Sequence, residues 1–156
     1  MIREATDNDR EAIIQLIDEI FQEYGDRVFL EGAESDLMAI SDEFYWKGGQ
    51  FWVYEIDHQI VGTAAVVPDN AGKAVLKRVY LHKNYRGSGI ADELLQKTQD
   101  WCRKNNFGTL CFWSDTRFER AHYFYEKRGF KRGGVRRMND GNMPYEEFYF
   151  EKNLDA

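Results

Sequence analysis

A strand, a glycine turn and a helix follow one another between Val75 and Cys102, and this stretch constrains the fold most. Apolar residues alternate at 75, 79 and 81, which predicts a half-buried strand. From residue 90 onward, apolar residues recur at helical spacing. Between the two, Gly87-Ser88-Gly89 offers backbone N–H groups that can approach an anion without a Cβ in the way, and the helix N-terminus adds unpaired donors. The stretch therefore predicts a phosphate-binding turn.

Two better-known phosphate-binding motifs do not fit this turn. A dinucleotide-binding fold needs a third glycine where this sequence has Asp92. A P-loop needs a lysine followed by serine or threonine, where this sequence has Ile90-Ala91. On these residues alone, a glycine turn without any ligand stays open.

Two segments resemble motifs of the GNAT family of N-acetyltransferases. Residues 86–91, Arg-Gly-Ser-Gly-Ile-Ala, resemble the family's pyrophosphate-binding motif, Arg/Gln-x-x-Gly-x-Gly/Ala. Residues 121–130 resemble its closing helix, Ala-x-x-x-Tyr-Glu-Lys-x-Gly-Phe, and follow at the family's spacing. The resemblance implies an α/β (α+β) fold: a mixed sheet of about seven strands, flanked by helices and splayed between the fourth and fifth strands to admit a cofactor.

Periodicity and turn signals predict a single domain over residues 1–156, with elements in the order βααββ, βαβα, ββ. Thr6 or Asp7 is the expected N-cap of the first helix, and Thr116 with Glu119 fits a capping box before the last one. The expected strands are 2–5, 51–56, 60–67, 75–81, 110–113, 130–138 and 145–151; the expected helices run to about 24, over 34–46, from 90 to a stop at 105–108, and from 116 to 129.

Composition and charge narrow the function classes. Apolar residues make up 43% of the chain, which excludes disorder, and no apolar run approaches the 18 residues of a membrane span. The first residues lack a secretion signal, so we expect a cytoplasmic protein with no membrane partner. Neither a CxxC motif nor a histidine cluster is present, so no metal is expected, and Cys102 and Cys111 are predicted to be buried thiols.

The net charge of −6 argues against nucleic-acid binding. The charge is unevenly distributed, with a balance of −11 over residues 1–57 and of +5 over residues 58–156. An acidic first third and a basic remainder suit a cationic substrate that meets an anionic cofactor. Solvated helix faces explain the same pattern equally well.

The resemblance implies acetyl-CoA as co-substrate and assigns residues to it. Pantetheine would pair with the strand residues, and a backbone N–H near Leu81 would face the thioester oxygen. Tyr125 matches the family's general acid; a phenol with a pKa near 10 stays neutral at pH 7 and can protonate a departing thiolate. The implied cofactor-binding residues are Val79, Tyr80, Leu81, Arg86, Gly87, Ser88, Gly89, Ile90, Ala91 and Asp92.

The sequence departs from the family pattern at two positions. Phe118 stands where many relatives carry a cofactor-contacting Asn, and Trp113 stands where some relatives carry a Glu base. The sequence therefore does not identify the general base. The candidate side chains are Asp115, Glu119, His82 and His122, and each has a simpler interpretation: Asp115 as a helix cap, Glu119 as the capping-box partner, and His82 and His122 as surface histidines. A base relayed through water, or no base at all, is also open.

The expected function is transfer of an acetyl group from acetyl-CoA to a primary amine, with a small cationic metabolite preferred as acceptor. The alternatives are a peptide lysine or N-terminus as acceptor, a non-catalytic acyl-CoA sensor, and a protein-interaction module with a disused cleft. A homodimer is an expectation from the resemblance only. Aromatic and acidic residues of the first two helices, facing the last hairpin, are the expected acceptor site: Glu23, Tyr24, Glu31, Glu34, Asp36, Trp46 and residues 139–145.

Overall fold

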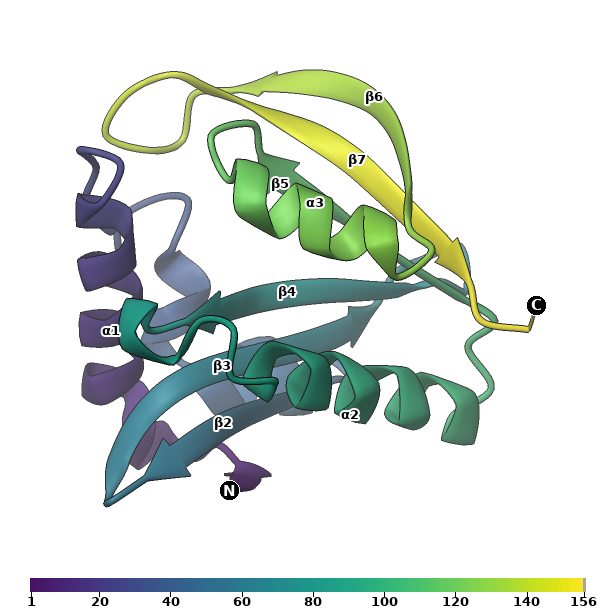
Figure 1. The fold of residues 1–156 in the computed structure, drawn as a ribbon, viewed down its shortest axis with the longest axis horizontal. Helices are drawn as coiled ribbons and strands as arrows, with labels where there is room; N and C mark the ends of the chain where they lie inside the picture. Colours follow the sequence, from purple (N-terminus) through teal and green to yellow (C-terminus); the bar gives the residue numbers. More distant parts are fainter. Residues whose placement is uncertain (156) are drawn as a thin grey trace.

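The computed structural model describes residues 1–155, which form one seven-stranded mixed sheet with helices on both faces (Figure 1). The strand order is β1-β2-β3-β4-β5-β7-β6. This architecture confirms the predicted fold class. The strands are β1 Ile2–Glu4, β2 Gln50–Ile56, β3 Gln59–Pro68, β4 Ala74–Leu81, β5 Thr109–Asp115, β6 Lys131–Met138 and β7 Tyr145–Asn153; the helices are α1 Arg10–Gln22, α2 Ile90–Lys104 and α3 Glu119–Lys127, with short turns η1 Asp7–Asp9, η2 Ser35–Met38, η3 Ser41–Tyr45 and η4 Lys83–Tyr85.

The middle of the sheet opens into a wedge. β4 and β5 are parallel and pair only at Ala74–Leu110 and Val75–Cys111. Beyond these pairs the two strands diverge, which Figure 1 shows as the space between β4 and the β5–β7–β6 layer. Every other neighbouring pair is antiparallel. The expected splay between the fourth and fifth strands is therefore present, and it leaves the β5-facing edge of β4 open.

Each face of the sheet has its own apolar core. The face covered by α2 and α3 buries Leu76, Leu94 and Phe112, among others. The opposite face, covered by α1 and the segment before β2, buries Ile13, Ile17 and neighbouring apolar side chains. Both free cysteines, Cys102 and Cys111, are buried as predicted. Within residues 1–155, no helix combines the length and the hydropathy that a membrane crossing requires.

The helix predicted over residues 34–46 is wrong. Two short turns, η2 and η3, replace it. Between them the backbone of Ala39 lies at φ −145° and ψ 82°, which is not a helical conformation. Tertiary contacts hold this break, because Asp36 binds the Arg78 guanidinium and the Asp7 carboxylate accepts a hydrogen bond from the Ser41 N–H at 3.0 Å. The apolar residues Leu37, Ile40 and Phe44 of this segment are nevertheless buried.

The capping box predicted before α3 is also wrong. The helix begins at Glu119 with Phe118 as N-cap, and no side chain caps it. The Asp115 carboxylate accepts a hydrogen bond from the Arg117 N–H at 2.9 Å and binds the guanidinium of the same residue. Asp115 is thus a turn residue paired with an arginine rather than a helix cap. In contrast, Thr6 is the N-cap of η1, the short turn that leads into α1, while the N-cap of α1 itself is Asp9 rather than the expected Thr6 or Asp7.

Candidate active site

The glycine turn has the backbone geometry that anion binding requires. Gly87 and Gly89 adopt φ values of 78° and 90°, which side-chain-bearing residues rarely adopt, and α2 begins immediately afterwards at Ile90. The Ser88 hydroxyl donates to the Tyr85 carbonyl and braces the turn. Because the first N–H groups of an α-helix have no acceptor within the helix, this turn presents several backbone donors together.

Two charged side chains at this turn point to other partners. The Arg86 guanidinium binds both carboxylate oxygens of Glu23, at 2.7 and 2.8 Å. The Asp92 carboxylate binds Arg128, with one contact at 2.8 Å. Backbone amides, rather than these side chains, are therefore the free hydrogen-bond donors of the turn.

A cavity of about 320 Å³ runs from this turn along β4, and we call it the turn-side cavity. Of the ten predicted cofactor-binding residues, six line it, whereas Ser88, Gly89, Ile90 and Asp92 do not. Its walls are mainly apolar, with Ile20 and Leu94 among them. The six predicted residues that line it are Val79, Tyr80, Leu81, Arg86, Gly87 and Ala91.

The Leu81 N–H points into the wedge. The neighbouring His82 N–H donates to the Val61 carbonyl at 2.8 Å, and Leu81 is in register with Gly62. In an antiparallel pair, hydrogen-bonded and non-hydrogen-bonded positions alternate, so Leu81 occupies a non-hydrogen-bonded position and its N–H faces away from β3. A backbone donor is therefore available where the sequence analysis expects one.

A second cavity of about 350 Å³ lies beside the first, and we call it the hairpin-side cavity. Residues of the segment before η2, of β4 and β5 and of the β6–β7 hairpin form its walls. Five residues line both cavities, so the two spaces meet inside the wedge. The shared residues are Val79, Tyr80, Phe118, Ala121 and Tyr125.

Tyr125 lies at this junction, where its ring packs against other aromatic rings and its hydroxyl makes no hydrogen bond with the described residues. The ring packs on Phe112, with centroids 4.5 Å apart, and on Phe130, and the residue is only 5% exposed. Among residues 1–155, the hydroxyl makes no hydrogen bond, yet no fully buried polar side-chain atom lacks a partner. The hydroxyl therefore reaches open space. Burial raises the pKa of Tyr125 well above its usual value, so the phenol stays protonated at neutral pH.

Phe118 builds an apolar wall where many GNAT relatives carry an amide. Its ring lies 4.9 Å from that of Tyr24, 6.2 Å from Phe21 and 6.4 Å from Tyr80, measured between centroids. These contacts join α1 to β4 across the start of α3. Trp113, at the position of the absent Glu, contacts the Tyr149 ring at a tilt of 58°, and the Arg136 guanidinium lies over its indole at 4.3 Å from the ring centroid. An indole in this position has no proton-accepting group.

None of the four candidate base residues lies free in either cavity. Asp115 lines the hairpin-side cavity, but Arg117 binds its carboxylate at 2.6 and 3.0 Å. Glu119 and His82 line neither cavity. The expectation that His122 is a surface residue is wrong: it is 1% exposed, and its Nε2 lies 3.0 Å from the Ser114 hydroxyl.

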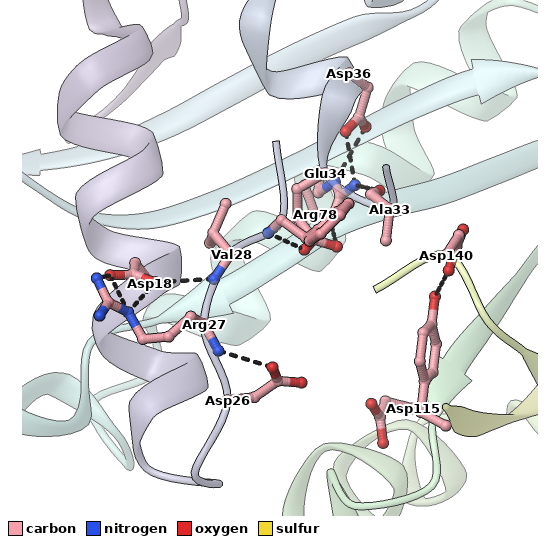
Figure 2. Close-up of polar contacts among 12 residues, drawn as sticks. Asp18, Asp26, Arg27, Val28, Ala33, Glu34, Asp36, Arg78, Asp115 and Asp140 are labelled. Atoms are coloured by element: carbon pink, nitrogen blue, oxygen red, sulfur yellow. Dashed lines mark hydrogen bonds and ion pairs between the residues drawn. The ribbon is translucent and has the colours of Figure 1, made fainter. Parts of the chain in front are cut away.

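Arg78, a half-buried residue that the sequence analysis missed, lines the hairpin-side cavity and makes polar contacts with residues 33–36 (Figure 2). Arg78 donates to the Asp36 carboxylate at 2.6 Å and to the Ala33 carbonyl at 2.8 Å, and its Nη1 lies 3.9 Å from Glu34. It has a φ of 54°, at a register irregularity between β3 and β4. A bulge of this kind re-aims a side chain and leaves no sequence signal.

Hydrogen bonds join the segment before η2 to the β6–β7 turn, and both border the hairpin-side cavity. The Ala33 N–H donates to the Asp140 carbonyl at 2.8 Å, and the Asn142 side-chain amide donates to the Arg27 carbonyl at 2.7 Å. Arg117 adds an ion pair with Asp26 at 3.0 Å. Of the residues expected at the acceptor site, Glu34 and residues 140–142 and 145 line the cavity, whereas Tyr24 lines the turn-side cavity and Trp46 is 80% exposed and lines neither.

Comparison with known proteins identifies the family. A family model described as an acetyltransferase (GNAT) domain matches residues 47–132. An N-acetylaspartate synthetase from Xenopus tropicalis is 30% identical over 118 residues, which cover 72% of this chain and 44% of that protein. This chain thus spans less than half the length of that relative.

Solved structures agree with this match. A GNAT-family acetyltransferase from Staphylococcus aureus Mu50 superposes with a TM-score of 0.87 at 25% identity, covering 99% of this chain and 98% of that one. A streptothricin acetyltransferase from Bacillus anthracis, solved with acetyl coenzyme A, has a TM-score of 0.59 at 20% identity and covers 67% of this chain and 62% of its own. The motifs, the splayed sheet and the family model lead to one conclusion: the chain belongs to the GNAT family of acetyltransferases.

Proposed function

We propose that the protein is an acetyl-CoA-dependent N-acetyltransferase that acetylates the primary amine of a small cationic metabolite. The observation that carries the proposal is the meeting of the two cavities at Tyr125. A direct transfer needs donor and acceptor to approach one point from different sides, with a proton donor beside it. The junction of the turn-side and hairpin-side cavities meets this requirement.

The turn-side cavity suits acetyl-CoA in its shape and its donors. The open edge of β4 offers backbone groups of Val79–Leu81 to the amides of pantetheine, and the glycine turn offers N–H groups to the diphosphate. Acetyl-CoA supplies an activated acetyl thioester. The Leu81 N–H is aimed to stabilise negative charge on the thioester oxygen, an interaction that contributes about 3 kcal/mol in comparable sites.

Tyr125 is the proposed general acid. Its protonated hydroxyl opens at the junction, where a leaving thiolate would need a proton. Phe118 and the rings around it form an apolar wall beside the same point. This arrangement supports protonation of the thiolate by the phenol rather than by solvent.

The acceptor is proposed to be small because hydrogen bonds join the two segments that border the hairpin-side cavity. A polypeptide lying across the site would pass between the segment before η2 and the β6–β7 turn, which the contacts of Ala33 and Asn142 hold together. Five carboxylates and five basic groups line the cavity, so total charge alone selects no acceptor. Most of the basic groups are already ion-paired, however, whereas Glu34 keeps one carboxylate oxygen without a hydrogen bond among the described residues. This supports a cationic amine.

The test is thiol release from acetyl-CoA with polyamines, aminoglycosides, amino acids and lysine peptides as acceptors. Rapid release with a small amine is the expected result. Release with peptides alone would favour the peptide acetyltransferase alternative. Tight calorimetric binding of CoA without turnover would favour a sensor, and absence of CoA binding would contradict the proposal altogether.

A further inference from the structure

Glu34 combines burial, a partly free carboxylate and a place in the hairpin-side cavity. The residue is 7% exposed, although glutamate is rarely buried. Its Oε1 accepts a hydrogen bond from the Phe29 N–H at 2.8 Å, which fixes the side chain. Its Oε2 has Arg78 Nη1 as an ion-pair partner only at 3.9 Å, beyond hydrogen-bonding distance. One oxygen is therefore held and the other is available.

The other carboxylates of this cavity are engaged differently. Arg117 binds Asp115 and Asp26, and Arg136 binds Glu147 at 2.7 Å. Asp140 accepts a hydrogen bond from the Tyr145 hydroxyl and is exposed at the rim. Glu34 is thus the carboxylate that is both buried in the cavity and incompletely paired.

We infer that Glu34 is the base that takes the proton from the ammonium group of the acceptor. The inference rests on the proposed function and deepens it, because the family's Glu position is occupied here by Trp113. Glu34 comes from the segment before η2 and Tyr125 from α3, and both residues line the hairpin-side cavity. Only Tyr125 also lines the turn-side cavity, so the base is assigned to the acceptor cavity and the acid to the junction with the cofactor cavity.

The surroundings of Glu34 tune it for this task. Burial raises its pKa, and the negative charges of Asp36 and Asp140 act in the same direction, while the Phe29 N–H and the Arg78 charge oppose the rise. Tyr80, on β4, and Tyr145, on β7, line the same cavity; burial raises the pKa of each phenol, and the charge of Glu34 adds to the rise. A carboxylate with a raised pKa is a stronger base than an ordinary one.

The proton balance closes with the two residues. The acceptor ammonium loses one proton to the Glu34 carboxylate and becomes a neutral amine, whose lone pair forms the C–N bond to the thioester carbon. When the C–S bond breaks, the thiolate takes the Tyr125 proton, and the phenol recovers a proton from the nitrogen as the amide forms. Glu34 finally releases its proton to solvent. The products are the acetamide, the free thiol and one proton.

The test is the pH profile of kcat/KM for Glu34→Gln with the best acceptor of the amine panel. Glutamine keeps an oxygen for the Phe29 N–H but takes up no proton. We expect a loss of about 100-fold at pH 7 that shrinks to less than about tenfold near pH 10, where solvent already supplies the neutral amine. Glu11→Gln is the matched control, because Glu11 is exposed on α1 and lines neither cavity; its profile should keep the wild-type shape.

A purely structural role for Glu34 predicts a different result. Glu34→Gln would then lower the rate by one factor at every pH, and that outcome overturns the assignment while leaving the acetyltransferase intact. If Glu34→Gln does not fold, Glu34→Asp retains a carboxylate and should keep the pH dependence at a lower rate; a flat profile for it also overturns the assignment. A wild-type protein that acetylates no amine overturns the proposed function itself, and the base with it.

Discussion

Glu23 and Arg86 form a two-pronged ion pair that fastens the end of α1 to the glycine turn. Both guanidinium nitrogens bind, one to each carboxylate oxygen, at 2.7 and 2.8 Å. The Arg86 charge holds the pKa of Glu23 below its usual range, so the carboxylate stays ionised at neutral pH. An anion therefore lies beside the turn at which a diphosphate would bind.

Replacing Glu23 by Gln should strengthen CoA binding. The change removes the anion and frees the Arg86 guanidinium, and exposed ion pairs of this kind involve up to about 1 kcal/mol, or roughly fivefold in affinity. Calorimetry at low and high salt measures the effect, which should fade as salt screens it. Asp18→Asn is the control, because Asp18 lies on α1 but pairs with Arg27. Weaker CoA binding by Glu23→Gln would mean that the pair organises the cleft instead.

Replacing Tyr125 by Phe should lower kcat by about 100-fold and leave the dissociation constant of CoA within about twofold of wild type. The ring contacts with Phe112 and Phe130 remain, so the melting temperature should change little. Tyr123→Phe is the control on the same helix, since that side chain is 62% exposed. Full activity of Tyr125→Phe across the pH range would rule out its role as the acid.

Replacing Gly32 by Ala should separate the segment before η2 from the β6–β7 turn at the border of the hairpin-side cavity. A Cβ at Gly32 would lie 2.1 Å from the Asp140 carbonyl oxygen, so the two bordering segments must move apart. We expect KM for a small amine to rise about tenfold, with about 1–3 kcal/mol lost in the free energy of unfolding. Gly134→Ala is the control, because its Cβ would meet no atom within 4 Å. Unchanged KM and stability for Gly32→Ala would contradict the bridging role.

His122 should make the fold sensitive to acid. Burial lowers its pKa in the folded state, so the unfolded state binds a proton more readily, and stability is full above about pH 6.5 and falls as the pH drops below it. His122→Gln can still bind the Ser114 hydroxyl but cannot become charged. Denaturant titrations at pH 8 and pH 5 should therefore show a smaller loss for the variant than for wild type. An equal loss would assign the acid sensitivity to other groups.

The local structures that were predicted correctly depend on short-range patterns. Glycines before a helix read as a turn because few other residues adopt positive φ, and this holds for Gly87 and Gly89. The period of 3.6 residues placed α1 and α2, whose apolar faces are buried. The same periodicity failed over residues 34–46, because Asp36 and Ser41 take partners in β4 and η1 that break the helix.

Local pattern determined the order of the strands, the glycine turn and the place of Tyr125 in its motif, because each depends on residues within one or two turns of chain. Only the tertiary structure decided which charges face the hairpin-side cavity. It placed the half-buried Arg78 beside the buried Glu34, paired Arg86 with Glu23, joined the segment before η2 to the β6–β7 turn and buried His122 in the core. These are contacts between residues far apart in the chain, and their energies depend on burial and distance, which sequence spacing does not encode.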